Sequence, residues 1–143
     1  MIIEFMKKPR VYLDTSVVSH LHQLDAKQEW QDITKRFWKE LEDNKYIACI
    51  SKFVLDEILK AKEEKQDIML GYLNSIDYEE LQNTREVDIL AKKYVEAGII
   101  PVKYIDDAMH IAIATINNCE IIASWNFKHM VKYKTIILVN RNK

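Results

Sequence analysis

The sequence has few residues that interrupt regular structure and few that can cross-link a chain. Only two glycines and two prolines occur in 143 residues, so most of the chain is expected in helices and strands joined by short loops. The two cysteines, Cys49 and Cys119, lie in apolar runs without a CxxC partner. This pattern favours two reduced, buried thiols, and nothing in it supports a disulfide.

Other absences bear on location and partners. No apolar run reaches the roughly 20 residues that a transmembrane helix needs, and the N-terminus is too short and too acidic in its apolar part for a signal peptide. We therefore expect a cytoplasmic protein that does not associate with a membrane. No basic excess is present, because 21 Lys and Arg oppose 22 Asp and Glu. Net charge alone therefore neither indicates nor excludes nucleic-acid binding.

The composition that is present is that of a globular protein. Apolar residues make up 48% and charged residues 30% of the chain, which suits a folded protein and not a disordered one. A chain of this length is long enough for a hydrophobic core and is the common size of one domain. We expect residues 1–143 to form a single domain.

Strand-like and helix-like segments alternate along the chain. Four short segments, at residues 10–14, 46–50, 121–124 and 135–139, are almost continuously apolar. Strands of that kind are covered on both faces, which is typical of a parallel sheet between layers of helices. The sequence therefore predicts an α/β fold, a three-layer α/β/α sandwich with a central parallel sheet.

The segments between these strands have helical spacing or helix-capping residues. Predicted caps are Thr15 or Ser16, Ser51, Thr84, and one of Asp106 and Asp107. A minor strand is predicted around residues 78–81. The predicted helices cover residues 15–24, 28–43, 51–63, 65–75, 84–97 and 109–116, with one further helical turn at 127–131.

Polar side chains follow the predicted strands at their carboxyl ends, where parallel sheets bind ligands. Asp14 ends the first strand, and Ser124 and Asn126 follow a later one. An Asp in this position is most often a helix cap. Because Thr15 and Ser16 could cap the helix instead, capping is a weaker explanation for Asp14 than for an Asp without such neighbours. The alternative for Asn126 is an ordinary turn residue.

Glu57 lies in a predicted helix, between Phe53 and Ala61 on the apolar side of the helical wheel. A carboxylate that is even half-buried is costly unless it is paired or binds a metal. The ordinary alternatives, a salt bridge or a side chain that reaches water, stay open.

Asp107 begins a helix that is apolar nearly all round, and it aligns with Ile111 on the helical wheel. Asp106, next to it, is expected to cap the helix or to lie beside the site. His110 lies one turn after Asp107, and by itself it is expected to be a hydrogen-bonded core histidine.

Three such acids without cationic neighbours in sequence are difficult to explain as stabilising groups, because grouped like charges repel. A hard cation, Mg²⁺ or Mn²⁺, would offset the repulsion and prefers oxygen ligands. In phosphodiester hydrolysis such a metal polarises the phosphoryl oxygen and activates water. The predicted catalytic and metal-binding residues are Asp14, Glu57 and Asp107, and the predicted supporting or water-positioning residues are Thr15, Ser16, Asp106, Ser124 and Asn126.

Residues 11–16, 54–58, 106–112 and 124–127 resemble, in order and spacing, the successive motifs of the PIN-domain family. The resemblance extends over residues 10–139 and includes the VapC-type toxins of type II toxin–antitoxin pairs. It implies a metal-dependent ribonuclease with Asp14, Glu57 and Asp107 as ligands, an antitoxin protein as partner, and a homodimer. Many members have an acid where this chain has Asn126, which leaves the number of metal ions open.

An RNA substrate would need cationic groups near the metal. Lys128, His129 and Lys132 lie in the best candidate segment for contacting phosphates, although a solvated basic turn is the ordinary alternative.

The sequence thus predicts a divalent-metal-dependent endoribonuclease that prefers single strands and acts as a toxin. Two other functions stay open. A non-catalytic PIN-like module that binds RNA or a protein is favoured by Asn126 and by the absence of a basic excess, whereas the three acids argue against it. A metal-dependent phosphatase or DNA nuclease is the other, although no inserted loops for gripping a duplex are evident.

Overall fold

A computed structural model describes residues 8–22 and 27–126 of the chain. The predicted helical turn at 127–131 and strand at 135–139 lie outside the described residues. In chain order the elements are β1 (Arg10–Leu13), α1 (Thr15–His20), α2 (Gln28–Glu42), β2 (Ile47–Ser51), α3 (Lys52–Leu59), α4 (Glu63–Leu73), β3 (Tyr78–Leu81), α5 (Arg85–Glu96), the 3-10 helix η2 (Val102–Tyr104), α6 (Ile105–Ile116) and β4 (Ile121–Ala123).

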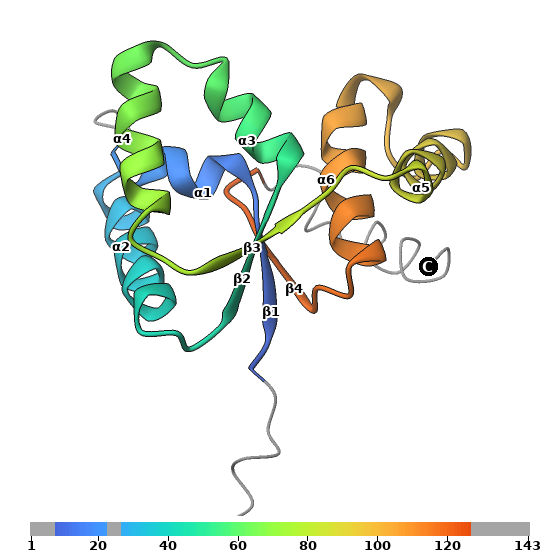
Figure 1. Cartoon of the computed structure of the whole chain (residues 1–143). Helices are drawn as coiled ribbons and strands as arrows, with labels where there is room; N and C mark the ends of the chain where they lie inside the picture. The colour runs from blue at the N-terminus through green and yellow to red at the C-terminus, as the bar shows by residue number, and fades with distance from the viewer. Residues whose placement is uncertain (1–7, 23–26, 127–143) are drawn as a thin grey trace, which may run out of the picture.

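The described strands form one parallel sheet in the order β3-β2-β1-β4. Helices α1, α2 and α4 lie on one side of this sheet, and α5 and α6 lie on the other (Figure 1). The predicted α/β/α sandwich with a central parallel sheet is confirmed. Of the four described strands, β3 is the one that was predicted only as a minor strand.

The order of the strands creates a switch point beside β1. The chain moves from β1 to β2 and then to β3 in one direction, and it returns through α5 and α6 to place β4 on the other side of β1. Helix α1, which follows β1, and helix α6, which precedes β4, therefore lie on opposite sides of the sheet (Figure 1). In open α/β sheets a ligand site lies at such a point, outside the carboxyl ends of the strands.

Burial differs between the inner and outer strands of the described sheet. Tyr12 and Leu13 in β1 and Ile50 in β2 are 0% exposed, whereas Tyr78 in β3 is 37% and Ile121 in β4 is 43% exposed. The prediction that apolar strands are covered on both faces therefore holds for β1 and β2. It is wrong for β4, because a strand at the edge of the described sheet has one neighbour fewer.

Several helix ends agree with the capping predictions. The Ser51 hydroxyl accepts a hydrogen bond from the Val54 amide at 3.1 Å, and the Thr84 hydroxyl accepts one from the Val87 amide at 3.4 Å. Gly98 follows α5 with a φ of 72°, a conformation that glycine adopts readily at the end of a helix. Ser51 and Thr84 are thus N-caps, as their type and position indicate.

The cap of α1 differs from its prediction. Thr15 is the first residue of this helix, and Asp14 occupies the N-cap position without a side-chain capping bond. Capping by Thr15 or Ser16 was therefore the wrong prediction, because the helix starts one residue earlier than a cap at either position requires. The helix predicted at residues 51–63 is shorter in the structure, since α3 ends at Leu59, and the helix predicted at 65–75 begins two residues earlier, at Glu63 in α4.

The start of α6 differs as well. This helix begins at Ile105, with Tyr104 in the N-cap position and no side-chain cap. Asp106 and Asp107 both lie within the first turn, so neither caps the helix as was predicted. Carboxylates in a first helical turn are favoured by the helix dipole without any capping bond.

Both cysteines are free, as predicted, but they differ in burial: Cys49 is buried, and Cys119 is only half-buried. Within residues 8–22 and 27–126, no helix combines the length and the apolar character that a membrane crossing requires.

Candidate functional site

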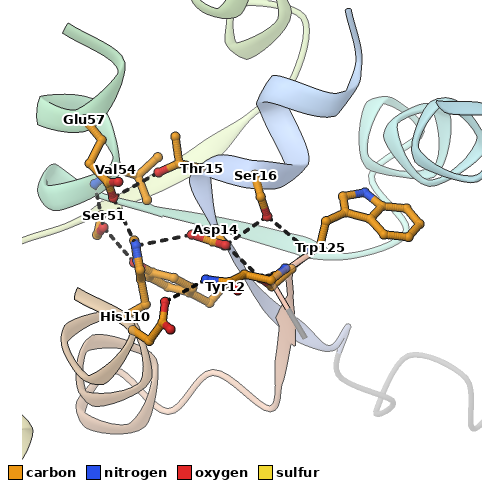
Figure 2. Close-up of polar contacts among 12 residues, drawn as sticks. Tyr12, Asp14, Thr15, Ser16, Ser51, Val54, Glu57, His110 and Trp125 are labelled. Atoms are coloured by element: carbon orange, nitrogen blue, oxygen red, sulfur yellow. Dashed lines mark hydrogen bonds and ion pairs between the residues drawn. The ribbon is translucent and has the colours of Figure 1, made fainter. Parts of the chain in front are cut away.

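The predicted polar residues gather at the carboxyl ends of β1 and β4, which is the switch point of the sheet. The backbone amide of Asp14 donates to the carbonyl of Ala123 at 3.1 Å, so the two strand ends stay paired. Figure 2 shows the ring of His110, from α6, between the carboxylates of Asp14 and Glu57. Residues distant in sequence thus meet at one edge of the sheet.

Asp14 is 6% exposed and is surrounded by hydrogen-bond donors. Its Oδ2 accepts from the Ser16 hydroxyl at 2.9 Å and from the Ser124 hydroxyl at 2.7 Å. Its Oδ1 lies 3.2 Å from His110 Nε2. All three contacts are directed at a carboxylate that makes no capping bond to α1, so helix capping does not explain the side chain of Asp14.

Glu57 reaches the same place from α3. Its Oε1 accepts from the Thr15 hydroxyl at 3.1 Å and lies 3.0 Å from His110 Nε2. The side chain is 32% exposed, which agrees with the position on the apolar side of the helix that its spacing predicted. No hydrogen bond to its second oxygen, Oε2, is present within the described part of the chain.

Asp107 lies on α6 and is 7% exposed. Its Oδ1 accepts from the Asn126 amide at 2.9 Å, and the backbone amide of Asn126 donates to the Ser124 hydroxyl at 2.9 Å. The Ser124 hydroxyl in turn donates to Asp14. A continuous set of hydrogen bonds therefore connects two of the predicted acids through the segment after β4.

Asp106 differs from its neighbour. It is exposed, and within the described residues its side chain makes no hydrogen bond to Asp14, Glu57 or Asp107. The helical rotation of about 100° per residue explains the difference, because it turns adjacent side chains to different faces. Of the five predicted supporting residues, the structure brings four into contact with the acids: Thr15, Ser16, Ser124 and Asn126.

Two residues of the site were missed by sequence reasoning, Tyr12 and His110. The Tyr12 hydroxyl lies 2.6 Å from His110 Nδ1 and 2.9 Å from the Ser51 hydroxyl. The signal was present in the spacing, since Tyr12 and Asp14 are two residues apart on one strand, and His110 is three after Asp107 on one helix. What the sequence did not show is that these two residues would meet.

Burial raises the pKa of Tyr12 far above its ordinary value, and the charges of Asp14 and Glu57 raise it further, although the Ser51 hydrogen bond opposes them. Tyr12 is therefore a neutral phenol at ordinary pH. It has both a hydrogen to donate and lone pairs to accept with.

Trp125 anchors the segment between Ser124 and Asn126. Its ring stacks on Trp30 of α2 with centroids 4.7 Å apart, and its indole N–H donates to the Thr34 hydroxyl at 2.9 Å. Trp30 is itself half-buried against Trp125. The stack fixes the backbone that presents Ser124 and Asn126.

The predicted RNA-binding residues Lys128, His129 and Lys132 lie outside the described residues, and their role stays a prediction. The described lysines in neighbouring segments, Lys52, Lys60 and Lys103, are exposed.

The acids fit a hard divalent cation in chemical kind, since carboxylate oxygens are the ligands that Mg²⁺ and Mn²⁺ prefer. Oε2 of Glu57 makes no hydrogen bond within the described ranges, so a cation could approach it without displacing a described contact. The side chains are not arranged as a finished ligand set, because no three Asp, Glu, His or Cys residues in the described ranges could hold a metal ion. His110 Nε2 instead lies between Asp14 and Glu57.

Comparison with known proteins agrees with this geometry. The family model for the PIN domain matches residues 11–128, a span that includes Asp14, Glu57, Asp107 and Asn126. The search of curated proteins finds no significant match. The PIN domain is generally a metal-dependent nuclease fold, and such domains typically bind divalent metals. Because the match extends over well more than half of the chain, this protein belongs to the PIN-domain family.

Proposed function

We propose that this protein is a divalent-metal-dependent endoribonuclease that hydrolyses phosphodiester bonds in RNA. The observation that carries the proposal is the meeting of Asp14 and Glu57 at the switch point of a PIN-domain sheet, with Asp107 connected to Asp14 through Asn126 and Ser124. A nuclease site of this family is expected to collect acids there.

Asp14, Glu57 and Asp107 are the residues that would hold Mg²⁺ or Mn²⁺. When bound, such a cation supplies polarisation of the phosphoryl oxygen and activation of a water molecule. The chain itself orients the acids: Ser16 and Ser124 donate to Asp14. Neutral donors of this kind hold a carboxylate in place without cancelling its charge, so the acid stays available to a cation.

Asn126 acts on Asp107 in the same way. Its amide donates to Asp107 Oδ1 at 2.9 Å, which an aspartate in this position could not do. We propose that Asn126 orients Asp107 and adds no charge to the site. This favours one metal ion over two.

The proposal is tested by incubating the purified protein with labelled single-stranded RNA, structured RNA, duplex DNA and a phosphate monoester, each with Mg²⁺ or Mn²⁺. Cleavage is expected for single-stranded RNA, with no product in EDTA and recovery when excess metal is returned. Cleavage that persists in EDTA would contradict metal dependence. A folded protein that binds RNA but cuts nothing in either metal would support a non-catalytic binding module.

The role of Asn126 makes a separate prediction. Asn126→Asp is expected to lower the free energy of unfolding in EDTA by about 1 kcal/mol, because a hydrogen bond to a carboxylate is lost and a like charge is placed beside it. Adding Mg²⁺ should restore stability. Thermal melts with and without Mg²⁺ measure both effects, and Asn126→Ser removes the contact without adding charge. If Asn126→Asp and Asn126→Ser had the same melting temperature in EDTA, that result would contradict the expected repulsion between the introduced carboxylate and Asp107.

We further propose that the ribonuclease is the toxin of a toxin–antitoxin pair, as the resemblance to VapC-type proteins implies. An antitoxin protein and a second copy of the chain are the expected partners. Induced expression in a bacterial host is expected to arrest growth, and substitution of the proposed metal ligands should relieve the arrest. Normal growth at an expression level that yields cleavage in the cell extract would overturn the toxin role alone.

A further inference from the structure

We infer that His110 is a positioning residue whose Nε2–H orients Asp14 and Glu57 for the metal, an inference that rests on the proposed function. Nε2 lies 3.2 Å from Asp14 Oδ1 and 3.0 Å from Glu57 Oε1. Ionised carboxylates only accept hydrogen bonds, so a nitrogen between two of them carries a hydrogen. One ring nitrogen therefore lies within ion-pair distance of two acids, one at the end of β1 and one on α3.

His110 is itself held in place from its other side. Nδ1 lies 2.6 Å from the Tyr12 hydroxyl, which is 2.9 Å from the Ser51 hydroxyl. The Ser51 hydroxyl accepts from the Val54 amide at the start of α3. When Nδ1 accepts the proton of the Tyr12 hydroxyl, Nε2 is the ring nitrogen that carries a hydrogen. Hydrogen bonds thus run from the backbone of α3 to His110, whose other ring nitrogen lies beside the carboxylates of Asp14 and Glu57.

Packing restricts the ring further. His110 is 3% exposed, and its ring centroid lies 5.0 Å from that of Phe53 and 5.6 Å from that of Tyr12. A ring enclosed in this way has little freedom to turn, so its N–H direction is fixed before any ligand arrives. A histidine that served only to fill the core would need a partner for each nitrogen, but not two acids on the same nitrogen.

The direction of the N–H also determines which oxygens remain. His110 contacts Oε1 of Glu57, and Thr15 donates to that same oxygen. Both donors thus engage one side of the carboxylate and leave Oε2 without a hydrogen bond among the described residues. On Asp14, His110 engages Oδ1, and the two serine hydroxyls engage Oδ2. The arrangement presents Glu57 to a cation by a defined oxygen.

Two amide substitutions separate positioning from core filling. In His110→Gln the side-chain NH₂ can reach the position of Nε2 and donate to the acids. In His110→Asn the amide reaches only the position of Nδ1, beside Tyr12. Both variants place an amide in the same buried space, so they form a matched pair.

The test is Mn²⁺ binding to the full chain by isothermal titration calorimetry, with thermal melts of each variant in EDTA. His110→Asn is expected to bind Mn²⁺ about 10- to 100-fold more weakly than the unsubstituted protein, as is typical when a ligand loses its hydrogen-bonded support. His110→Gln should retain most of the affinity. Equal affinities for all three proteins would overturn the role of His110. No Mn²⁺ binding by the unsubstituted protein would overturn the proposed function, and with it this inference.

A second measurement needs no variant to fold. In the unsubstituted protein labelled with ¹⁵N-histidine, the His110 Nε2 resonance is expected to show a bonded proton and to shift as Mg²⁺ is added. Its chemical shift should follow the same saturation curve as Mg²⁺ binding by calorimetry. An Nε2 without a proton, or one that does not respond while Mg²⁺ binds, would contradict the inference.

Discussion

Asp107→Asn is expected to lower the rate of RNA cleavage by more than the roughly 10- to 100-fold that loss of a supporting contact costs. The substitution removes the charge of a proposed metal ligand. The Asn126 amide donates to Asp107 Oδ1 at 2.9 Å. The amide oxygen introduced by the substitution can accept the same hydrogen bond. The folded state should therefore persist while activity is lost. Initial cleavage rates at saturating Mg²⁺, with a thermal melt of the same sample, measure the two effects.

Asp106→Asn is the matched control, because it makes the same chemical change one residue away. Asp106 is exposed, whereas Asp107 is 7% exposed. Its substitution should leave cleavage close to that of the unsubstituted protein. If both variants lost activity equally, net charge near the RNA would explain the effect better than metal ligation. Full activity in Asp107→Asn would remove this residue from the proposed site.

Leu13→Ala is expected to lower the free energy of unfolding by about 2–5 kcal/mol, the range for large-to-small substitutions in a core. Leu13 is 0% exposed and immediately precedes Asp14 on an inner strand. Removing its side chain leaves a cavity where β1 packs between the helix layers. Since domains are stable by only about 5–15 kcal/mol, this is a large fraction of the total. Urea unfolding followed by circular dichroism measures it.

Leu59→Ala is the control for that prediction. The chemical change is identical, but Leu59 is 57% exposed at the end of α3. Surface substitutions of this kind usually change the free energy of unfolding by less than about 0.5 kcal/mol. If Leu13→Ala lowered the free energy of unfolding as little as Leu59→Ala does, β1 would not lie in the core. In that case the position of Asp14 at a buried strand end would need revision.

Much of the fold follows from local patterns in the sequence. Apolar runs without alternation predicted β1 and β2 as covered strands, and hydrophobic periodicity predicted α2 to within one residue. Ser51 and Thr84 were predicted as caps because a hydroxyl before a helix satisfies an amide three residues on. These features depend on a residue and its near neighbours, so they can be read from the sequence.

Predictions failed where an element boundary depended on tertiary contacts. Thr15 and Ser16 were expected to cap α1, but the structure directs their hydroxyls to Glu57 and Asp14. A hydroxyl can cap a helix or support an acid, and both uses have the same local pattern. The choice between them depends on which acid packs nearby. That information lies in residues such as Glu57, which is 42 positions from Thr15 in the chain.

The sequence by itself determined the chemical inventory of this protein and the elements that carry it: acids at one strand end and on two helices, in a parallel α/β fold. Only the tertiary structure decided that β4 lies beside β1, so that Ser124 can donate to Asp14. It alone placed His110 between Asp14 and Glu57, with Tyr12 behind it. The physical reason is that helix and strand periods specify which face a side chain occupies, whereas the order of strands specifies which faces meet.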